Sequence, residues 1–314
     1  MARYRVVLTD QVFPDVELER ELLAGIDAEL VIPSGGHDDV IAAAADADAI
    51  LNTYMPLSAA DVARLTSARI IARYGIGVDN IDLAAARAAG IVVTNVPDYS
   101  VEEVAAHTLA LMLAAIRRLP RAMELAAAGS WSIDQLRPIT RISEMSVGVV
   151  GLGRIGRRVA ALLRPFGGRI LGYDPYTGSA PPGVELVGNL DDILVSSDIV
   201  TLHLPVTAET RGMIGAAQLS RMRSHAILVN TSRGALVRTE DLVRSLRDGA
   251  IAGAALDVLE REALDAPALA GLPNVILTPH MAYYSESSLR ESQRKAASQI
   301  IKVLRGEPPD YPVN

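Results

Sequence analysis

The chain has 314 residues, of which 50% are hydrophobic and 21% are charged, a length and composition sufficient for two domains with separate cores. The net charge of −7 excludes a general nucleic-acid surface, because phosphate binding needs clustered Lys and Arg, and the arginines here are scattered among acids. The lack of cysteine excludes disulfides and thiolate zinc sites, so we expect no metal and a cytoplasmic location.

In the first part of the chain, short apolar runs alternate with alanine-rich helical segments, which predicts α/β architecture with a doubly wound parallel sheet. Helices are expected over residues 59–65 and 83–89. The expected strands are residues 4–10, 28–33, 48–54, 69–75 and 91–96.

A long apolar helix over about residues 101–118 leads into a second series of strands. It is shorter than the roughly 20 apolar residues that a membrane span needs, so we expect no membrane insertion. The second series predicts another doubly wound sheet. Its expected strands are residues 146–153, 168–175, 198–205, 225–232, 251–259 and 274–280.

The last segment, residues 285–305, has helical spacing. Our hypothesis is that it crosses back to pack on the first domain. The first domain would then be discontinuous, formed by residues 1–99 and 285–314, with a Rossmann domain of residues 100–284 inserted between them.

The second series begins with a glycine-rich loop, in which Gly151, Gly153 and Gly156 match G-x-G-x-x-G between an apolar run and a helix. The first glycine permits a tight turn, the second lets the backbone approach pyrophosphate, and the third allows close helix packing. Asp174 ends the next strand at about the 20-residue offset expected of a ribose-binding acid, which favours NAD over NADP. The alternative is an ordinary glycine turn and a strand-end aspartate.

Three residues farther along supply a cation, an acid and an imidazole: Arg233, Glu262 and His280. His280 follows a strand, where open α/β sheets place ligands, and imidazole is the usual group for proton transfer near neutral pH. A carboxylate bonded to the far ring nitrogen would fix the tautomer. Read from the residues alone, Glu262 is also consistent with a solvated loop acid and Arg233 with a surface or capping residue.

The motifs GLGRIG, YDPY, TLHLP, LVNTSRGALV, GAALDVLEREAL and TPH, in this order, resemble the D-isomer-specific 2-hydroxyacid dehydrogenases over nearly the whole chain. More narrowly, RYGIGVDNID, NVPDYSVEE, TPHMAYYSE and the terminal PVN resemble the C-terminal binding protein branch, whose animal members are transcriptional co-repressors. The resemblance implies a flavodoxin-like substrate domain around the Rossmann NAD domain.

The resemblance also implies catalytic roles. Arg233 would bind the substrate carboxylate, His280 would protonate the carbonyl oxygen, and Glu262 would keep His280 protonated until that moment. The backbone of Gly75, Ile76 and Gly77 would bind the carboxylate from the first domain. Arg73 would add a second charge there, and its alternative is a salt bridge at a strand end.

Further cofactor contacts follow from the same resemblance. Arg154 and Ile155 would offer backbone to pyrophosphate, and Thr108 would touch the cofactor from beneath, unless its hydroxyl bonds its own helix. Of two other groups of residues, one would wall the adenosine and the other would face the nicotinamide side. The alternative for both is that they belong to ordinary buried strands, which have the same composition. The adenosine group is His203, Leu204 and Pro205, and the nicotinamide group is Thr231, Ser232 and Asp257.

Two departures from the family pattern concern the substrate. Ala263 follows Glu262 where proline is usual, so we expect a less fixed loop there. Tyr283 stands where the co-repressor branch has tryptophan, and Tyr54 is a candidate for the opposite wall, although tyrosines are also routine packing residues.

We therefore predict an NAD-dependent oxidoreductase that interconverts a small 2-oxo acid and its D-2-hydroxy acid. The alternative is an NAD(H)-sensing scaffold of the co-repressor type with little turnover. The resemblance implies a homodimer, for which the apolar helix and the segment through Trp131 could supply the interface or could equally be core.

Overall fold

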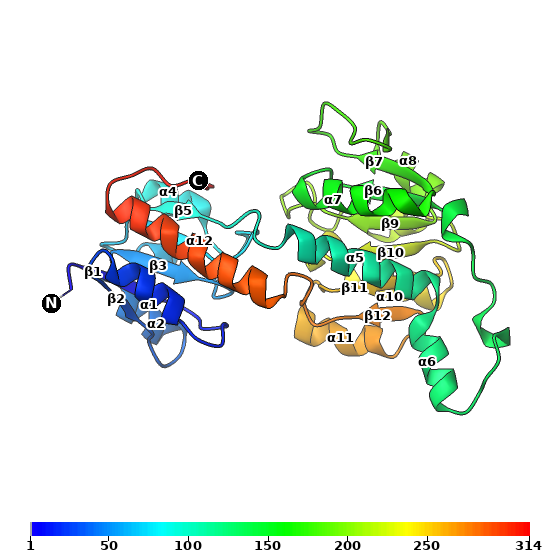
Figure 1. The fold of residues 1–314 in the computed structure, drawn as a ribbon, viewed down its shortest axis with the longest axis horizontal. Helices are drawn as coiled ribbons and strands as arrows, with labels where there is room; N and C mark the ends of the chain where they lie inside the picture. Colours follow the sequence, from blue (N-terminus) through cyan, green and yellow to red (C-terminus); the bar gives the residue numbers. More distant parts are fainter. Residues whose placement is uncertain (1) are drawn as a thin grey trace. The chain divides into compact units, whose positions relative to one another are not determined.

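The computed structural model describes residues 2–314, which form two compact units, each built on its own parallel sheet (Figure 1). The first unit runs from the start of the chain to Tyr99 and also includes Ser285–Asn314. The second unit is Ser100–Tyr284. No helix among residues 2–314 combines the length and apolar character needed to cross a membrane.

The sheet of the first unit has five strands, all parallel, in the order β2-β1-β3-β4-β5. This is the flavodoxin-like doubly wound order. Both β3 and β4 are buried along their whole length, as expected when helices cover both faces of a sheet. The strands are β1 (Tyr4–Leu8), β2 (Ala28–Val31), β3 (Ala49–Asn52), β4 (Ile70–Arg73) and β5 (Val92–Thr94).

The last helix of the chain, α12, packs against α1, β3 and β4 of this unit. The helix expected over residues 59–65 is shorter than predicted, because α3 ends at Val62, where the chain turns toward the next strand. The core lies between the sheet and its helices and includes Val7, Ile41 and Ile71. The helices are α1 (Glu17–Ala24), α2 (His37–Ala44), α3 (Ala59–Val62), α4 (Leu83–Ala88) and α12 (Glu286–Leu304).

The sheet of the second unit has seven parallel strands in the order β12-β11-β10-β9-β6-β7-β8. Counted from β6, this is the dinucleotide-binding order 3-2-1-4-5-6 with one further strand, and β6 and β9 are the neighbours on either side of which the strand order runs in opposite directions. The strands are β6 (Ser146–Val150), β7 (Arg169–Tyr173), β8 (Glu185–Leu186), β9 (Ile199–Leu202), β10 (Ile227–Asn230), β11 (Gly253–Leu256) and β12 (Val275–Leu277).

Helices cover both faces of this second sheet (Figure 1). Helices α5 and α7 pack together over one core, and α8, α9 and α10 cover the other. The prediction of two doubly wound parallel sheets is therefore confirmed. The α-helices are α5 (Val101–Ile116), α6 (Leu119–Ala127), α7 (Arg154–Leu163), α8 (Leu190–Ser196), α9 (Ala216–Leu219), α10 (Thr239–Arg247) and α11 (Glu262–Ala270). Short 3-10 turns are Asp134–Leu136, Ile142–Glu144, Arg164–Phe166 and Gly234–Leu236.

Candidate active site

Three adjacent strands bring Arg233, Glu262 and His280 to one edge of the second sheet. Strands β10, β11 and β12 pair in register, with Asn230 opposite Leu256 and Leu256 opposite Leu277. These are the last residues of their strands, and the three functional candidates follow them. The carboxyl edge of the sheet therefore gathers a guanidinium, a carboxylate and an imidazole.

Glu262 and His280 are in direct contact. The Oε1 atom of Glu262 lies 2.8 Å from Nδ1 of His280. The imidazole is 29% exposed and the carboxylate 53%, so water and small solutes can reach the pair. A carboxylate can only accept, so Nδ1 carries a proton and Nε2 is the ring nitrogen that can exchange one with another molecule.

The backbone of His280 has a φ of 52°, the left-handed region that non-glycine residues rarely adopt. Hydrogen bonds on both sides hold this conformation. The N–H of His280 donates to the carbonyl oxygen of Asp257 at 2.9 Å, and the carboxylate of Asp257 accepts the N–H groups of Met281 and Ala282, both at 2.9 Å. Asp257 is buried and also accepts from the hydroxyl of Thr278 at 2.6 Å. Its carboxylate therefore organises the turn that carries the imidazole.

The segment after Glu262 is a helix, so the expectation of a less fixed loop is wrong. Glu262 is the first residue of α11. The buried carboxylate of Asp265 accepts from the N–H of Arg261 at 3.0 Å and from the hydroxyl of Thr239 at 2.8 Å, and it pairs with the Arg261 guanidinium. Burial opposes ionisation, but these hydrogen bonds outweigh it and lower the pKa of Asp265. These contacts anchor the start of α11, and with it the backbone of Glu262.

Arg233 lies in the turn after β10. Its Nη1 donates to the carbonyl oxygen of Ser232 at 2.8 Å, and its own carbonyl oxygen accepts from the side-chain amide of Asn230 at 2.8 Å. The next residue, Gly234, has no room for a side chain, because a Cβ atom there would lie 1.9 Å from the carbonyl oxygen of Leu259. The turn that carries Arg233 thus packs backbone to backbone against the segment that leads to Glu262.

The glycine-rich loop has the geometry that a dinucleotide requires. Gly151 has a φ of 92°, and a Cβ atom at Gly156 would lie 2.0 Å from the carbonyl oxygen of Gly151. At Gly153, by contrast, an added Cβ atom would meet no atom of the described chain within 4 Å. Two glycines therefore serve close packing, and the second faces open space at the N-terminus of α7, where a phosphate is favoured. Arg154 and Ile155 are the first residues of that helix.

Asp174 follows β7 and is tied to the glycine-rich loop. Its carboxylate accepts the N–H of Leu152 at 2.8 Å and the N–H of Tyr176 at 2.9 Å. Each oxygen of a carboxylate can accept more than one hydrogen bond, so the side chain keeps capacity for hydroxyl donors such as those of a ribose. A hydrogen bond therefore ties the acid directly to the glycine-rich loop.

His203 stands after β9, across from the glycine-rich loop. Its N–H donates to the carbonyl oxygen of Val150 at 2.7 Å, and its Nε2 lies 3.0 Å from the hydroxyl of Thr201. Burial lowers the pKa of His203 to about 3, so the ring is neutral at physiological pH. Leu204 is half-buried and Pro205 exposed, and the carbonyl oxygen of Leu204 accepts from the hydroxyl of Ser232 at 2.6 Å.

The hydroxyl of Thr108 bonds its own helix, which is the alternative that the sequence left open. Its Oγ1 lies 2.7 Å from the carbonyl oxygen of Val104 and 2.7 Å from Oγ1 of Thr231, and the side chain is fully buried. The preceding residue, His107, was not among the predicted site residues, yet its Nε2 lies 3.0 Å from Oγ1 of Thr278. A histidine inside an apolar helical run was the only sequence signal for it.

The candidate substrate residues of the first unit lie at the carboxyl ends of β3 and β4. The guanidinium of Arg73 lies over Gly75, where a Cβ atom would be 1.9 Å from Nη1, and Nε donates to Asn80 at 3.3 Å. The carbonyl oxygen of Ile76 accepts from the side chain of Asn95 at 2.7 Å. In the described part of the chain, the N–H groups of Ile76 and Gly77 donate to no acceptor. A buried guanidinium and these N–H groups form a cluster of donors.

The two tyrosines that we expect to wall the substrate side chain, Tyr54 and Tyr283, lie in different units. Tyr54 is exposed, and its N–H donates to the carboxylate of Asp10, which shapes the turn after β3. Tyr283 lies beside His280, with the ring centroids 6.1 Å apart in an edge-to-face arrangement. Tyr283 is therefore placed to contact whatever reaches the imidazole.

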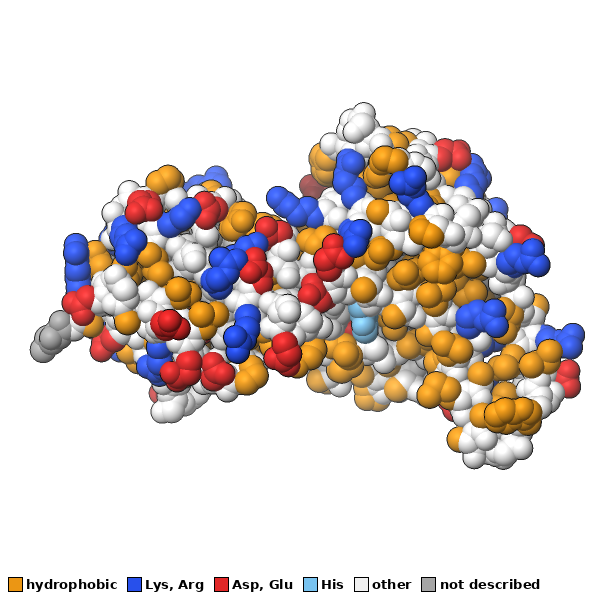
Figure 2. All heavy atoms as spheres, viewed as in Figure 1, with side chains coloured by type: hydrophobic (Ala, Val, Ile, Leu, Met, Phe, Trp, Pro, Cys, Tyr) orange, Lys and Arg blue, Asp and Glu red, His pale blue; other side chains and the backbone are white. Residues whose placement is uncertain are grey.

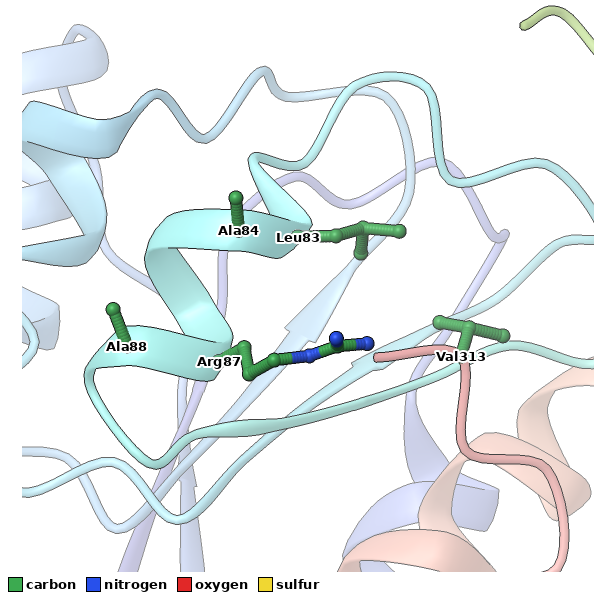
Figure 3. A pocket seen from close by; sticks show the side chains of 5 residues that line it. All are labelled: Leu83, Ala84, Arg87, Ala88 and Val313. Atoms are coloured by element: carbon green, nitrogen blue, oxygen red, sulfur yellow. The ribbon is translucent and has the colours of Figure 1, made fainter.

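One open pocket of the first unit holds none of these residues. It is lined by α4 and the end of the chain, and Figure 3 shows Arg87 pointing toward Val313. Its other lining residues are Leu83, Ala84 and Ala88. In residues 2–314 no group of three or more His, Asp or Glu side chains is arranged to hold a metal ion.

The fold and the glycine-rich loop define a protein with a dinucleotide-binding domain, and the comparisons with known proteins identify its family. The model of the family D-isomer specific 2-hydroxyacid dehydrogenase, NAD binding domain, matches residues 109–282. The chain belongs to this family, and its second unit contains the NAD-binding domain. The cofactor prediction is thereby confirmed.

Individual relatives agree with the family. The chain is 42% identical to D-3-phosphoglycerate dehydrogenase of Methanocaldococcus jannaschii over 78% of its length and 47% of the relative. It is 40% identical to glyoxylate reductase of Korarchaeum cryptofilum, over 86% of the chain and 83% of the relative. The chain thus spans about half the length of the phosphoglycerate dehydrogenases that it matches.

Among solved structures, D-lactate dehydrogenase from Aquifex aeolicus, complexed with NAD and lactic acid, superposes with a TM-score of 0.90 and 30% identity, over 96% of each chain. D-2-hydroxyisocaproate dehydrogenase gives a TM-score of 0.83 and 25% identity over 98% of this chain and 99% of that one. These structures share the two-sheet architecture described above.

Proposed function

We propose that the protein is an NAD-dependent oxidoreductase that interconverts a small 2-oxo acid and its D-2-hydroxy acid. The observation that carries the proposal is the 2.8 Å contact between Glu262 and Nδ1 of His280, at the carboxyl edge of the sheet that also bears the glycine-rich loop. Relatives named glyoxylate reductase and D-lactate dehydrogenase support the substrate class.

In the direction of reduction, NADH supplies the hydride to the carbonyl carbon, and the chain supplies the proton and the charge. Nε2 of His280 donates a proton to the carbonyl oxygen, so the 2-oxo acid becomes a hydroxy acid and the imidazole becomes neutral. Glu262 stabilises the imidazolium before this transfer and fixes its orientation. Arg233, with a permanent charge and a planar fork of donors, binds the carboxylate and polarises the carbonyl.

The residues that would hold NAD follow the carboxyl ends of successive strands. The glycine-rich loop and the first N–H groups of α7 suit the pyrophosphate, and Asp174 suits the ribose. His203, Leu204 and Pro205 are proposed to wall the adenosine. Thr231, Ser232 and Asp257 are proposed on the nicotinamide side. Of these, Asp257 also fixes the His280 turn, so its variants should impair both binding and rate.

Residues of the first unit are proposed to recognise the substrate. Arg73 and the N–H groups of Ile76 and Gly77 are proposed to bind negative charge on the substrate, which the donor cluster of the first unit supports. Tyr54 and Tyr283 are proposed to choose among side chains. The membership of the C-terminal binding protein branch also stays a prediction that rests on its sequence motifs.

The test is NADH oxidation with a panel of glyoxylate, hydroxypyruvate, pyruvate, and branched and thioether 2-oxo acids. We expect turnover with at least one, and His280→Ala should reduce kcat about 100- to 10,000-fold while NADH fluorescence still reports binding. Retained NADH binding without turnover on any acid would instead favour the NAD(H)-sensing scaffold. An Asp174→Ala protein with unchanged preference for NADH over NADPH would contradict the role of that residue.

We also propose that the chain forms a homodimer through α6 and the segment that follows it. Apolar side chains gather over α6 in Figure 2. Large apolar side chains are exposed here, including Met123 at 71% and Trp131 at 93%. A monomer rarely leaves such side chains clustered in water. Sedimentation at low concentration should show a dimer that Met123→Glu with Trp131→Asp converts to a monomer, and a monomeric parent chain would overturn the proposal.

A further inference from the structure

Helix α5 carries two neighbouring polar side chains in its middle, His107 and Thr108, and each reaches the end of a different strand of the second sheet. Nε2 of His107 lies 3.0 Å from Oγ1 of Thr278, after β12. Oγ1 of Thr108 lies 2.7 Å from Oγ1 of Thr231, after β10. Thr278 stands two positions before His280, and Thr231 stands two positions before Arg233, so each threonine is close in sequence to a residue of the proposed reaction.

The protons on the His107 side can be assigned from the partners. The hydroxyl of Thr278 lies 2.6 Å from Oδ1 of Asp257, and a carboxylate only accepts, so Thr278 donates there. The same hydroxyl must then accept from His107, whose Nε2 therefore carries a proton. Asp257 in turn accepts the N–H groups of Met281 and Ala282. A directed chain of hydrogen bonds thus runs from α5 to the turn that holds His280.

At Thr108 the hydrogen bond runs in the opposite direction, from the strand end to α5. The single hydroxyl proton of Thr108 goes to the carbonyl oxygen of Val104, which can only accept, so the hydroxyl of Thr231 donates to Thr108. Thr108 is fully buried, and a buried hydroxyl left without its partner costs about 1–3 kcal/mol, so this contact is expected to persist. It fixes the first residue after β10 to the same helical turn that fixes the end of β12.

We propose that His107 and Thr108 are positioning residues, through which α5 sets the spacing between the imidazole of His280 and the guanidinium of Arg233. This inference rests on the proposed function. The left-handed backbone of His280 supports it, because a strained conformation persists only where surrounding contacts determine it. Adjacent residues on a 16-residue helix have a fixed separation, so one rigid element holds both strand ends.

The test compares His107→Leu with His107→Gln, and Thr108→Val with Thr108→Ser. Loss of the His107 donor should lower kcat roughly 10- to 100-fold, because misplacement of a proton donor by about 1 Å has an effect of that order. Loss of the Thr108 hydroxyl should mainly raise KM for the 2-oxo acid and weaken oxamate inhibition. Gln and Ser, which keep the hydrogen bonds, should restore most of each loss, and NADH affinity should stay within about twofold for the His107 variants.

Thr94→Val is the matched control, since Thr94 is a buried threonine of the first unit whose hydroxyl has no hydrogen-bond partner in the described chain. It should leave kcat and KM unchanged. Variants of His107 and Thr108 that lose the hydrogen bond but keep wild-type kcat, KM and oxamate affinity would overturn the proposal. A loss of kcat that Gln does not restore would assign His107 to packing alone.

Amide hydrogen exchange gives a readout that does not depend on turnover. His107→Leu should speed exchange at residues 278–282, and Thr108→Val at residues 228–236, with the rest of the chain unchanged. Unaltered protection in both segments would overturn the proposal even in an inactive protein. The proposed function fails separately, if the wild-type protein turns over no 2-oxo acid or if His280→Ala remains fully active.

Discussion

The carboxyl edges of the two sheets differ in how their functional side chains are held. At the edge of the second sheet, Glu262 pairs with His280, and a buried aspartate fixes the turn around the imidazole. At the edge of the first sheet lie the Arg73 guanidinium, which donates to Asn80, the backbone N–H groups of Ile76 and Gly77, and the exposed Tyr54. Under the proposed function, the edge of the second sheet is specialised for one reaction, whereas the edge of the first sheet provides general anion recognition that can serve many acids.

This difference teaches which residues should vary in their effect with the substrate. A change at the second edge removes an interaction that every 2-oxo acid needs in the transition state. A change at the first edge, or at Tyr283, alters contacts with the particular side chain of the acid.

Substitution of Arg233 and of Arg73 should show the largest difference between the edges of the two sheets. Arg233→Ala should lower kcat/KM about a thousandfold for every active acid, roughly 4 kcal/mol of transition-state stabilisation. Arg73→Ala should lower it about tenfold, by an amount that differs among acids. Steady-state kinetics on the panel measures both. Arg121→Ala, which removes an exposed pair with Glu124, is the control, and equal losses for Arg233 and Arg73 would remove the distinction between the edges.

Gly234→Ala tests the packing that links the Arg233 turn to the Glu262 segment. The new methyl group would lie 1.9 Å from the carbonyl oxygen of Leu259, so the backbone must shift. We expect kcat to fall roughly 10- to 100-fold, because a shift of about 1 Å misplaces Glu262 against His280. Thermal unfolding should report a lower Tm in parallel. Unchanged kcat would mean that the two segments move independently.

Gly153→Ala tests the cofactor loop with little steric cost to the protein itself. A methyl group there meets no atom of the described chain within 4 Å, so the Tm without cofactor should not change. NADH titrated by fluorescence should nevertheless bind about tenfold more weakly, because the second glycine allows backbone approach to pyrophosphate. Wild-type affinity would place the dinucleotide elsewhere.

Exchange of the aromatic side chains should have a smaller effect, on preference more than on rate. Tyr283→Trp removes the phenol hydroxyl and enlarges the ring beside His280, so the ratio of kcat/KM between a polar and an apolar 2-oxo acid should change about tenfold. Tyr54→Phe, which keeps the ring, should change the ratio less. A uniform loss across the panel would assign Tyr283 to the machinery of the reaction.

The smallest effects concern two buried carboxylates, one in each unit. Burial raises the pKa of Glu19 despite hydrogen bonds from Tyr74 and Gln293. The folded state then holds this proton more tightly than the unfolded state, so its stabilisation is present below pH 4.5 and is lost as pH rises through the folded pKa. For Asp265, whose pKa is lowered, stabilisation is present above pH 3.8 and is lost as pH falls.

Amide exchange between about pH 2 and pH 7, corrected for the intrinsic rate, measures both contributions. As the pH falls, α1 and α12 should gain protection while α11 loses it. Glu19→Gln should abolish the pH dependence in the first unit and leave that of the second unit in place. Parallel changes in the two units would show that these carboxylates do not control local stability.

Much of the fold could be predicted from the sequence, because buried parallel strands read as continuous apolar runs. The runs around Ile70 and Val147 became β4 and β6 in this way. The edge strand β8 escaped prediction, since it has only two residues, Glu185 and Leu186, both exposed and without an apolar pattern. Its place depends on pairing with β7, a long-range contact that local sequence does not encode.

The residues of the candidate site were predictable where a spacing or strand end marks them, as at Gly153, Asp174 and His280. Their supporting contacts were not. His107 and Thr278 are 171 positions apart, and only the folded sheet brings them within 3.0 Å. Likewise, the start of a helix at Glu262 depends on the buried carboxylate of Asp265, which bonds Thr239 of another helix.

The central claim is that the edge of the second sheet performs a stereospecific reduction with His280 as proton donor. The most direct measurement is chiral chromatography of the product formed from NADH and the best 2-oxo acid of the panel, with His280→Ala run in parallel. We predict the D-2-hydroxy acid alone from the wild-type protein and almost none from the variant. An L or racemic product, or equal product from His280→Ala, would contradict the claim.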